Sequence, residues 1–271
     1  MDAEFYTKLA APAQTKIVML ILDGLGGLPA EPGGKTELET AHTPHLDRLA
    51  AQSKLGLSQP AGPGVTVGSG PGHLALFGYD PIHYEIGRGA LEALGVDFEL
   101  GADDLAARGN FCTVDAQGCI TDRRAGRLAT EISRSLAEKL RTIRVPGVTF
   151  FVEPVKEHRF AFVARAEGLG DALSESDPLK TGVPTLPVRA LNPESERAAG
   201  YVNQFIEQAR LLLAKDSPAN MITLRGFNKL PVLPSFSERY GLHAASIAVN
   251  GMYRGVSKLA GLDLVPLCGE T

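Results

Sequence analysis

The stretch KIVMLILDGLGG, residues 16–27, decides the fold class that we expect. Its apolar run has the length of a strand, shows no alternation and stops at Asp23-Gly24. Such a run is typical of a strand buried on both faces, as in the parallel sheet of an α/β protein. Ligands of these folds bind beyond the carboxyl ends of the strands, which is where Asp23 lies. We therefore predict an α/β protein with Asp23 close to its site.

The segment TPHLDRLAAQS, residues 43–53, predicts a helix after this strand. Thr43 is a suitable N-cap and Pro44 a suitable first helical residue. Leu46, Leu49 and Ala50 form an apolar stripe at helical spacing. A strand, a loop and a helix are the opening of a βαβ unit.

The middle of the chain has a different pattern. Residues 110–126 and 148–165 each predict a hairpin, and residues 127–143 and 195–216 predict amphipathic helices. After this middle region the alternation of strands and helices resumes. Short buried strands are expected within residues 219–226 and 243–251, and a helix is expected within residues 253–261. We place an insertion at about residues 96–225.

Composition narrows the class of protein. The 271 residues are enough for one large domain or two small ones, and the net charge of −4 gives no argument for a nucleic-acid or membrane partner. Cys112, Cys119 and Cys268 fit no zinc or redox spacing and are expected to be reduced thiols. No run approaches the roughly 20 apolar residues of a membrane span, and the start lacks a secretory pattern. We expect a soluble protein of the cytoplasm.

Asp23 and two residues of the Gly-rich segment VTVGSGPGHLALFGY, residues 65–79, are candidates for chemistry. Asp23 can cap a turn or bind a hard metal ion. Ser69, between two glycines, is a loop residue or a nucleophile, and a nucleophile needs a base or a metal for activation. The pattern is neither G-x-S-x-G nor a Walker A loop. His73 is a core or capping histidine, or it orients the loop and contacts a phosphate.

Arginines in the middle region suggest an anionic ligand. They are Arg88, Arg108, Arg123, Arg124, Arg127, Arg159 and Arg225. Arg123 and Arg124 point to opposite faces if their segment is extended. Arginines at strand ends and turns suit bidentate binding of phosphate or carboxylate, although most surface arginines are simply solvated.

The ordered motifs LILDGLGG, TPHLDRLA, GSGPGHLALFGYDP, GRGALEALG and NFCTVDAQGCITDRRAGR resemble cofactor-independent phosphoglycerate mutases of the archaeal type. That family belongs to the alkaline phosphatase superfamily of metalloenzymes. The segments HRFAFV, SDP at 176–178, ITLRGFNKLPVLPSFSERYGL and GMYRGVSKLAGLDL extend the resemblance over nearly the whole chain from Lys16.

The resemblance implies an α/β fold with an alkaline-phosphatase-like sheet domain, residues 1–95 plus 226–271. It also implies an inserted smaller α/β domain, residues 96–225, that closes over the substrate. The implied reaction interconverts 3-phosphoglycerate and 2-phosphoglycerate in glycolysis and gluconeogenesis through a phosphoserine at Ser69, without 2,3-bisphosphoglycerate. Asp23 and Ser69 match ligands of one of two divalent metal ions, Mn²⁺ or Mg²⁺. The implied substrate-binding residues are His73, Arg123, Arg124, Arg127, Arg159 and Arg225.

One departure concerns the metal ligands. In the family the remaining aspartates and histidines follow the segment that corresponds to GLDL, whereas this sequence reaches Thr271 without such a cluster. We therefore expect an incomplete sheet domain and a metal site that this chain only half supplies. A phosphatase or another phosphomutase of the same superfamily, and a fragment that binds phosphorylated acids without catalysis, are the alternatives.

Overall fold

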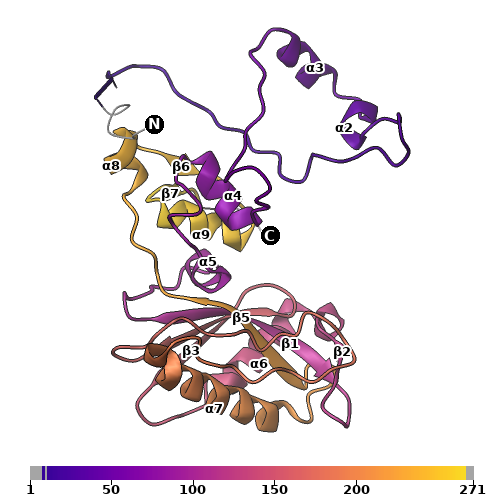
Figure 1. The fold of residues 1–271 in the computed structure, drawn as a ribbon, viewed down its shortest axis with the longest axis vertical. Coiled ribbons are helices and arrows are strands. Elements are labelled where there is room, and N and C mark those ends of the chain that lie inside the picture. The colour runs from indigo at the N-terminus through magenta and orange to yellow at the C-terminus, as the bar shows by residue number, and fades with distance from the viewer. Residues whose placement is uncertain (1–7, 10, 267–271) are drawn as a thin grey trace. The chain divides into compact units, whose positions relative to one another are not determined.

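The computed structural model describes residues 8–9 and 11–266, and it divides into two compact units. One unit is Leu9–Gln59, and the other begins at Pro60 and also includes Lys8. Figure 1 labels the elements of both. Because their relative placement is not determined, each unit is described by itself. Cys268 lies outside the described residues.

The unit Leu9–Gln59 contains two short helices, α2 (Glu37–Thr40) and α3 (Pro44–Ala51). Thr36 and Glu39 form a capping box at the start of α2, with each side chain accepting a hydrogen bond from the other residue's backbone N–H. The predicted helix is confirmed at α3, where Thr43 is the N-cap and Pro44 the first helical residue. None of the described residues in this unit is buried.

The strand predicted within residues 16–22 is wrong for this structure. These residues have no regular secondary structure, and Ile17 is 82% exposed. The physical reason is that a strand needs a partner for its backbone N–H and C=O groups. The described residues of the unit Leu9–Gln59 form no other strand that could provide one.

A five-stranded antiparallel sheet is the centre of the unit that begins at Pro60. Its strands are β1 (Leu105–Val114), β2 (Ile120–Asp122), β3 (Thr149–Pro154), β4 (Arg159–Arg165) and β5 (Met221–Asn228). The strand order is β2-β1-β4-β3, and β5 pairs with β1. Both predicted hairpins are confirmed, as β1–β2 and β3–β4. The predicted strand within 219–226 is also confirmed, as β5.

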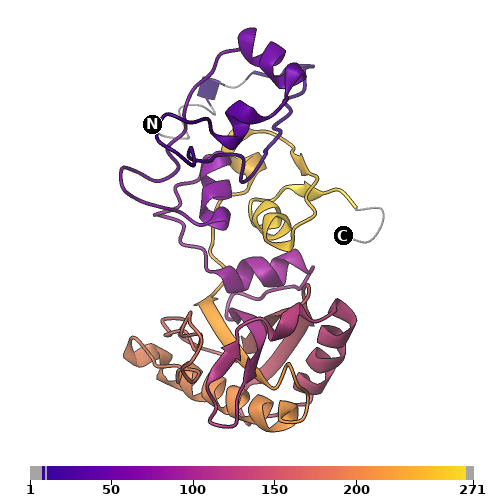
Figure 2. The same cartoon turned by 90° about the vertical axis from the view of Figure 1, so that its right-hand side faces the viewer.

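Two predicted helices, α6 (Thr130–Leu140) and α7 (Glu196–Leu213), cover one face of the sheet. Figures 1 and 2 show both on the side of the sheet away from α5 (Arg88–Gly95). The core between these helices and the sheet contains the rings of Phe150, Phe162 and Phe205, which pack against one another at tilted angles. Ala161 and Val163 alternate with Phe162 along β4 and contact α5 instead. Successive side chains of β4 thus point alternately toward the core under α6 and α7 and toward α5.

Helix α5 also packs against α9 (Gly251–Leu259), in a second apolar cluster with α4 (Ser69–Leu76). A Cβ at Gly95 would collide with the backbone of Gly251, so the two helices approach at the level of their main chains. The remaining short elements are α8 (Phe236–Tyr240), β6 (Ala245–Ser246), β7 (Asp263–Leu264) and the 3₁₀ turns η1 (Ala125–Arg127) and η2 (Pro193–Ser195). Strands β6 and β7 pair in parallel. No helix among the described residues is long and apolar enough to cross a membrane.

Candidate anion-binding site

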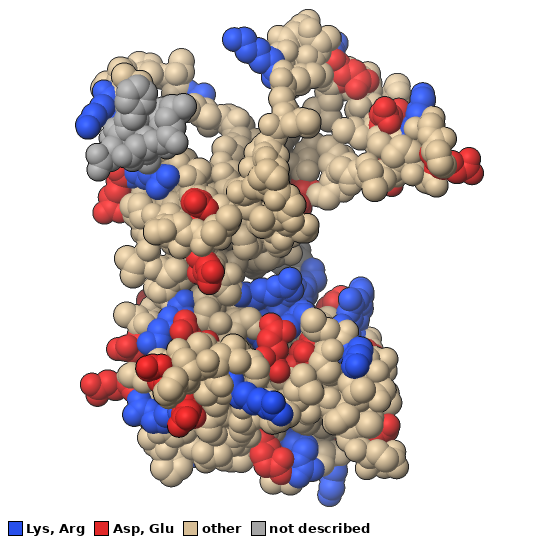
Figure 3. Space-filling model, in the orientation of Figure 1, with Lys and Arg blue, Asp and Glu red and all other residues tan. Residues whose placement is uncertain are grey.

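A polar patch lies on the sheet face that also contacts α5. Residues 105, 107 and 111 of β1 belong to the core under α6 and α7, so the alternate residues Arg108 and Asn110 belong to the opposite face. In the ladder Arg108 is opposite Arg225 of β5, and Asn110 is opposite both Thr223 of β5 and Arg159 of β4. Arg108 and Arg225 are therefore direct neighbours, and Arg159 lies next to β1 two residues farther along, at Asn110. Figure 3 shows basic side chains gathered over this part of the sheet.

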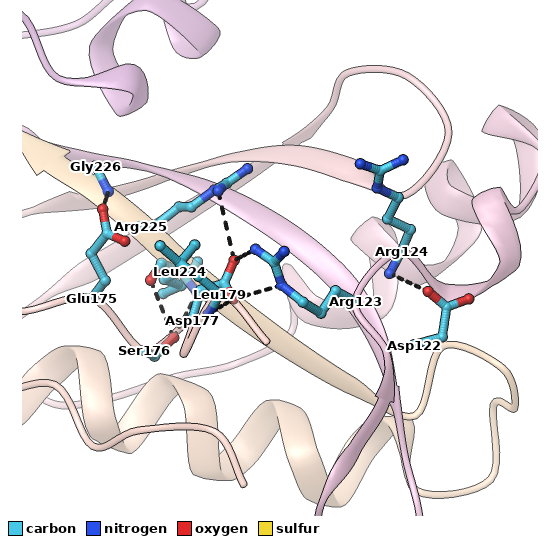
Figure 4. Close-up of polar contacts among 10 residues, drawn as sticks. All are labelled: Asp122, Arg123, Arg124, Glu175, Ser176, Asp177, Leu179, Leu224, Arg225 and Gly226. Carbon is cyan, nitrogen blue, oxygen red and sulfur yellow. Dashed lines mark hydrogen bonds and ion pairs between the residues drawn. The ribbon is translucent and has the colours of Figure 1, made fainter. Parts of the chain in front are cut away.

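Two buried carboxylates contact this patch. Glu92 of α5, whose side chain is 2% exposed, accepts a hydrogen bond from Nη2 of Arg108. Asp177, whose side chain is 1% exposed, accepts two from Arg123: Nε to Oδ1 at 3.1 Å and Nη2 to Oδ2 at 2.8 Å. Nη1 of Arg225 lies 3.8 Å from the same carboxylate (Figure 4). Arg123 after β2 and Arg225 on β5 therefore meet at one side chain.

Positive charge exceeds negative charge in this arginine cluster, which we define as Arg88, Arg108, Arg123 and Arg225. Burial lowers the pKa of Arg225, and the charges of Arg108, Arg88 and Arg123 lower it further, while Asp177 opposes them. Burial by itself would raise the pKa of Asp177, but the hydrogen bonds from Arg123 and from Leu179 N–H hold it below its ordinary value. Arg108 pairs with Glu92, and Arg123 and Arg225 interact with Asp177, so the four cations outnumber these two carboxylates.

Several polar atoms of the patch have unused hydrogen-bonding capacity. Within the described part of the chain, the buried Nε atoms of Arg108 and Arg225 have no hydrogen-bond partner. The same holds for the buried Oδ1 of Asn110. Buried polar atoms without partners are uncommon because each costs free energy. Cationic N–H donors in this state are suited to an anionic ligand.

A second basic group surrounds His158, at the turn between β3 and β4. Burial lowers the pKa of His158 to about 4, and the nearby Arg159, Arg124 and Arg127 lower it as well, while Glu157 has the opposite effect. The Nδ1 atom of His158 is buried without a hydrogen-bond partner in the described structure. Arg159 connects this group to the sheet, since it pairs with Asn110 across the β1–β4 ladder.

The loop after β2 places its arginines through an unusual backbone. Asp122 accepts hydrogen bonds from the N–H groups of Arg124 and Gly126, and its pKa is lowered as a result. Ala125 and Arg127 have φ values of 45° and 52°, in the left-handed region that residues with a Cβ seldom occupy. Strain of this kind concentrates at functional sites.

The five predicted arginines divide into two sets in this structure. Arg123 and Arg225 meet at Asp177, and Arg124, Arg127 and Arg159 surround His158. In Figure 4 the side chains of Arg123 and Arg124 point in different directions, although both residues follow the end of β2.

Ser69 and His73 both belong to α4. Ser69 is the first residue of the helix after the N-cap Gly68, and it is exposed. A ring nitrogen of His73 lies 3.1 Å from the carbonyl oxygen of Ser69, and the ring stacks on Tyr253 at 4.1 Å between centroids. His73 therefore contacts the main chain of Ser69 and packs against α9.

Asp23 belongs to the unit Leu9–Gln59, and Ser69 belongs to the other unit. Asp23 is exposed, in a turn after residue 22. Among the described residues there is no group of three or more His, Cys, Asp or Glu side chains that could hold a metal ion. The described residues by themselves therefore do not make up a metal site.

Asn110, Glu92 and Asp177 were not among the predicted site residues, and Arg108 was named only among the arginines of the middle region. A signal for Arg108 and Asn110 does exist in the sequence, because both are polar residues that alternate with apolar ones in a strand. Asp177 belongs to the segment SDP at 176–178 that extends the family resemblance, but no local pattern indicates its role. It approaches Arg123 from 54 residues away along the chain, which is a matter of tertiary structure.

Together these features define an α/β protein with a basic, partly buried cluster of side chains that is a candidate site for an anion. A model of the family "2,3-bisphosphoglycerate-independent phosphoglycerate mutase" matches residues 50–220. The chain belongs to this family. The sequence-based family resemblance and the expected mixed α/β fold class are thereby confirmed.

Individual relatives agree with this membership. The chain is 48% identical over 265 residues to a protein of Thermus thermophilus and 46% identical over 266 residues to one of Thermotoga maritima. Both are named "Probable 2,3-bisphosphoglycerate-independent phosphoglycerate mutase", and each alignment covers 97% of this chain and 65% of the relative. The chain thus spans just under two thirds of the length of these curated relatives.

Two solved structures are similar to this one. The cofactor-independent phosphoglycerate mutase of Thermoplasma acidophilum superposes with a TM-score of 0.59 at 32% identity, covering 73% of this chain and 56% of the other. A protein of Pyrococcus horikoshii superposes with a TM-score of 0.73 at 28% identity, covering 90% and 60%.

Proposed function

We propose that this protein takes part in the interconversion of 3-phosphoglycerate and 2-phosphoglycerate, a step of glycolysis and gluconeogenesis in the cytoplasm. The observation that carries the proposal is the arginine cluster with unpartnered buried Nε atoms on Arg108 and Arg225. Both substrates carry a phosphate and a carboxylate, and guanidinium groups bind each of these in bidentate fashion. Membership of the phosphoglycerate mutase family supports the same choice of ligand.

Ser69 is the proposed phosphoryl acceptor. Its Oγ gives up its proton and attacks the phosphorus, the bond from phosphorus to the substrate oxygen breaks, and that oxygen takes up a proton. After the glycerate turns, its other hydroxyl attacks the phosphoserine and Ser69 is regenerated. The position of Ser69 supports this role, because the first N–H groups of a helix lack partners within the helix and favour negative charge.

The proposed substrate residues are His73 together with Arg123, Arg124, Arg127, Arg159 and Arg225. His73 acts on the position of Ser69 through the carbonyl oxygen that it contacts. The arginines bind the charged ends of the glycerate and keep it near the phosphoserine while it turns. Residues 96–225 are the proposed closing domain, and residues 1–95 plus 226–271 the sheet domain. Closure keeps water from hydrolysing the phosphoserine.

The two divalent metal ions implied by the family resemblance remain part of the proposal, with Asp23 and Ser69 as two of the ligands. The described residues do not complete such a site. For that reason the proposed roles in phosphoryl transfer and substrate binding belong to Ser69, His73 and the arginines of this chain.

A coupled assay with 3-phosphoglycerate, in the presence of Mn²⁺ or Mg²⁺, tests the function. We expect Ser69→Ala to lower the rate more than about 1000-fold, as the loss of a nucleophile does in other enzymes. Ser58→Ala, at an exposed serine of the unit Leu9–Gln59, is the control and should keep the rate. Full activity of Ser69→Ala would contradict the role of Ser69. Release of inorganic phosphate in place of 2-phosphoglycerate would indicate a phosphatase instead.

A further inference from the structure

We propose that Asp177 is a positioning residue. Its buried carboxylate holds Arg123 and Arg225 together, on the side away from solvent, in the arrangement that binds the anionic ligand. This inference rests on the proposed function, because it concerns the same arginines. The inference adds a negatively charged residue to the positively charged arginines of the proposed site. A carboxylate repels a phosphorylated acid, so Asp177 acts through the arginines and not by contact with the ligand.

The contacts of Asp177 lead to this role. The carboxylate accepts hydrogen bonds from Nε and Nη2 of Arg123, so the guanidinium plane is fixed on one edge. Nη1 of Arg123 has no hydrogen-bond partner among the described residues and remains available. The side chain of Asp177 is 1% exposed, whereas that of Arg123 is 29% exposed and that of Arg225 19%. An anion that arrives from solvent therefore meets the arginines before it can approach the carboxylate.

The backbone around Asp177 is fastened to β5 next to Arg225. Ser176 N–H donates to the carbonyl oxygen of Leu224 at 2.9 Å, and Leu224 N–H donates to Oγ of Ser176 at 2.7 Å. On the other side of Arg225, Gly226 N–H donates to Oε1 of Glu175 at 3.2 Å. Figure 4 shows these contacts on both sides of Arg225. The hydrogen bonds of residues 175–177 to β5 thus fix the distance between the carboxylate of Asp177 and the strand that carries Arg225.

The carboxylate is itself held in place by its own segment. Leu179 N–H donates to Oδ1 of Asp177 at 2.9 Å, and Leu179 adopts a φ of 59°. A left-handed leucine is unfavourable, so surrounding contacts must hold it there. Asp177 therefore has a fixed orientation before any ligand binds, as a positioning group requires.

Asp104 provides a matched control within the same sheet region. It is also buried, with a side chain 2% exposed, and it accepts Nε and Nη2 of Arg165 at 2.7 and 2.6 Å. Arg165 lies over the ring of Phe151, and it is not one of the arginines that interact with Arg225. Asp177→Asn and Asp104→Asn therefore remove the same kind of buried ion pair, one inside the arginine cluster and one outside it.

The test has two measurements on the 271-residue chain. The first is hydrogen exchange of arginine Nε–H groups by NMR in ligand-free wild type, Asp177→Asn and Asp104→Asn. We expect the Nε–H of Arg123 to exchange at least about tenfold more slowly than that of exposed Arg124 in the wild type. Asp177→Asn should remove this protection, whereas Asp104→Asn should remove only that of Arg165.

The second measurement is the calorimetric dissociation constant for 3-phosphoglycerate. Hydrogen bonds to charged groups predict an increase of roughly 10- to 100-fold in Asp177→Asn. Asp104→Asn should change the constant less than about twofold. Affinity in Asp177→Asn that is unchanged or tighter than in the wild type would overturn the inference, since the carboxylate would then be neutral or a competitor.

The two hypotheses fail in different ways. If the wild type binds no 3-phosphoglycerate, the proposed function fails, and the Nε–H exchange of Arg123 alone decides the role of Asp177. If Asp177→Asn does not fold, the wild-type exchange rates still decide it. Equal rates for Arg123 and Arg124 would contradict a fixed guanidinium.

Discussion

The unit Leu9–Gln59 and the sheet of β1–β5 differ sharply in burial. The first has no buried residue among those described, although it contains the longest apolar run that we used to predict the fold. The sheet has a continuous core on one face and buried charged residues on the other. The difference teaches that an apolar pattern becomes a strand only where the same structure supplies partner strands and a covering layer.

The largest expected effect comes from removing the same side chain in each region. Ile222 of β5 is 0% exposed in the core, whereas Ile17 is 82% exposed. Ile222→Ala should lower the free energy of unfolding by about 2–5 kcal/mol, because it leaves a cavity. Ile17→Ala should change it by less than about 0.5 kcal/mol. Urea denaturation measures both, and similar losses in the two variants would show that residue 17 is buried in solution.

Protonation of His158 should make the sheet region sensitive to acid. Its pKa is lowered to about 4 by burial and the neighbouring arginines, while an unfolded histidine titrates near 6.5. As pH falls, the unfolded chain therefore takes up this proton first. The contribution to stability is fully present above pH 6.5 and is lost toward pH 4, by about 1.4 kcal/mol per pH unit at most.

The pH dependence can be assigned with two variants. Unfolding free energies at pH 7 and pH 5.5 should differ less in His158→Asn than in the wild type. His42→Asn, in the exposed unit, should keep the wild-type difference. A wild-type pH dependence in His158→Asn would show that His158 is not the group responsible.

Two glycine positions show the same contrast between the buried and the exposed region. A Cβ at Gly89 would collide with the backbone between Ala106 and Ala107, where α5 lies on β1. Gly89→Ala should therefore lower the free energy of unfolding by about 1–3 kcal/mol. Gly56 of the exposed unit has nothing within 4 Å of such a Cβ, and Gly56→Ala should be neutral or slightly stabilising. Thermal unfolding compares the two, and equal melting temperatures would contradict close packing of α5 on the sheet.

Local patterns predicted much of the sheet region. The hairpins β1–β2 and β3–β4 and the helices α6 and α7 follow from alternation, helical periodicity and turn residues. The antiparallel pairing of β5 with β1 was not predicted, because their residues are more than 100 positions apart. The prediction for residues 16–22 was wrong because an apolar run indicates that a segment can be a buried strand. It does not indicate whether a second strand is available to pair with it.

The site was predictable only in part, and for the same reason. The motif around Arg123, Arg124 and Arg127 predicted a segment that contributes to the candidate site. Their division into a set at Asp177 and a set at His158 depends on tertiary contacts. Arg108 and Glu92 form an ion pair between a strand and a helix, which no local pattern reports.

Calorimetric titration of 3-phosphoglycerate into wild type, Arg225→Gln and Arg210→Gln tests whether the arginine cluster is the anion site. Arg225 belongs to the cluster, whereas Arg210 is exposed on α7 and pairs with Glu207. Loss of charged hydrogen bonds predicts a dissociation constant at least about tenfold larger for Arg225→Gln. Arg210→Gln is expected to bind like the wild type. Wild-type affinity in Arg225→Gln would contradict the assignment of the ligand to this face of the sheet.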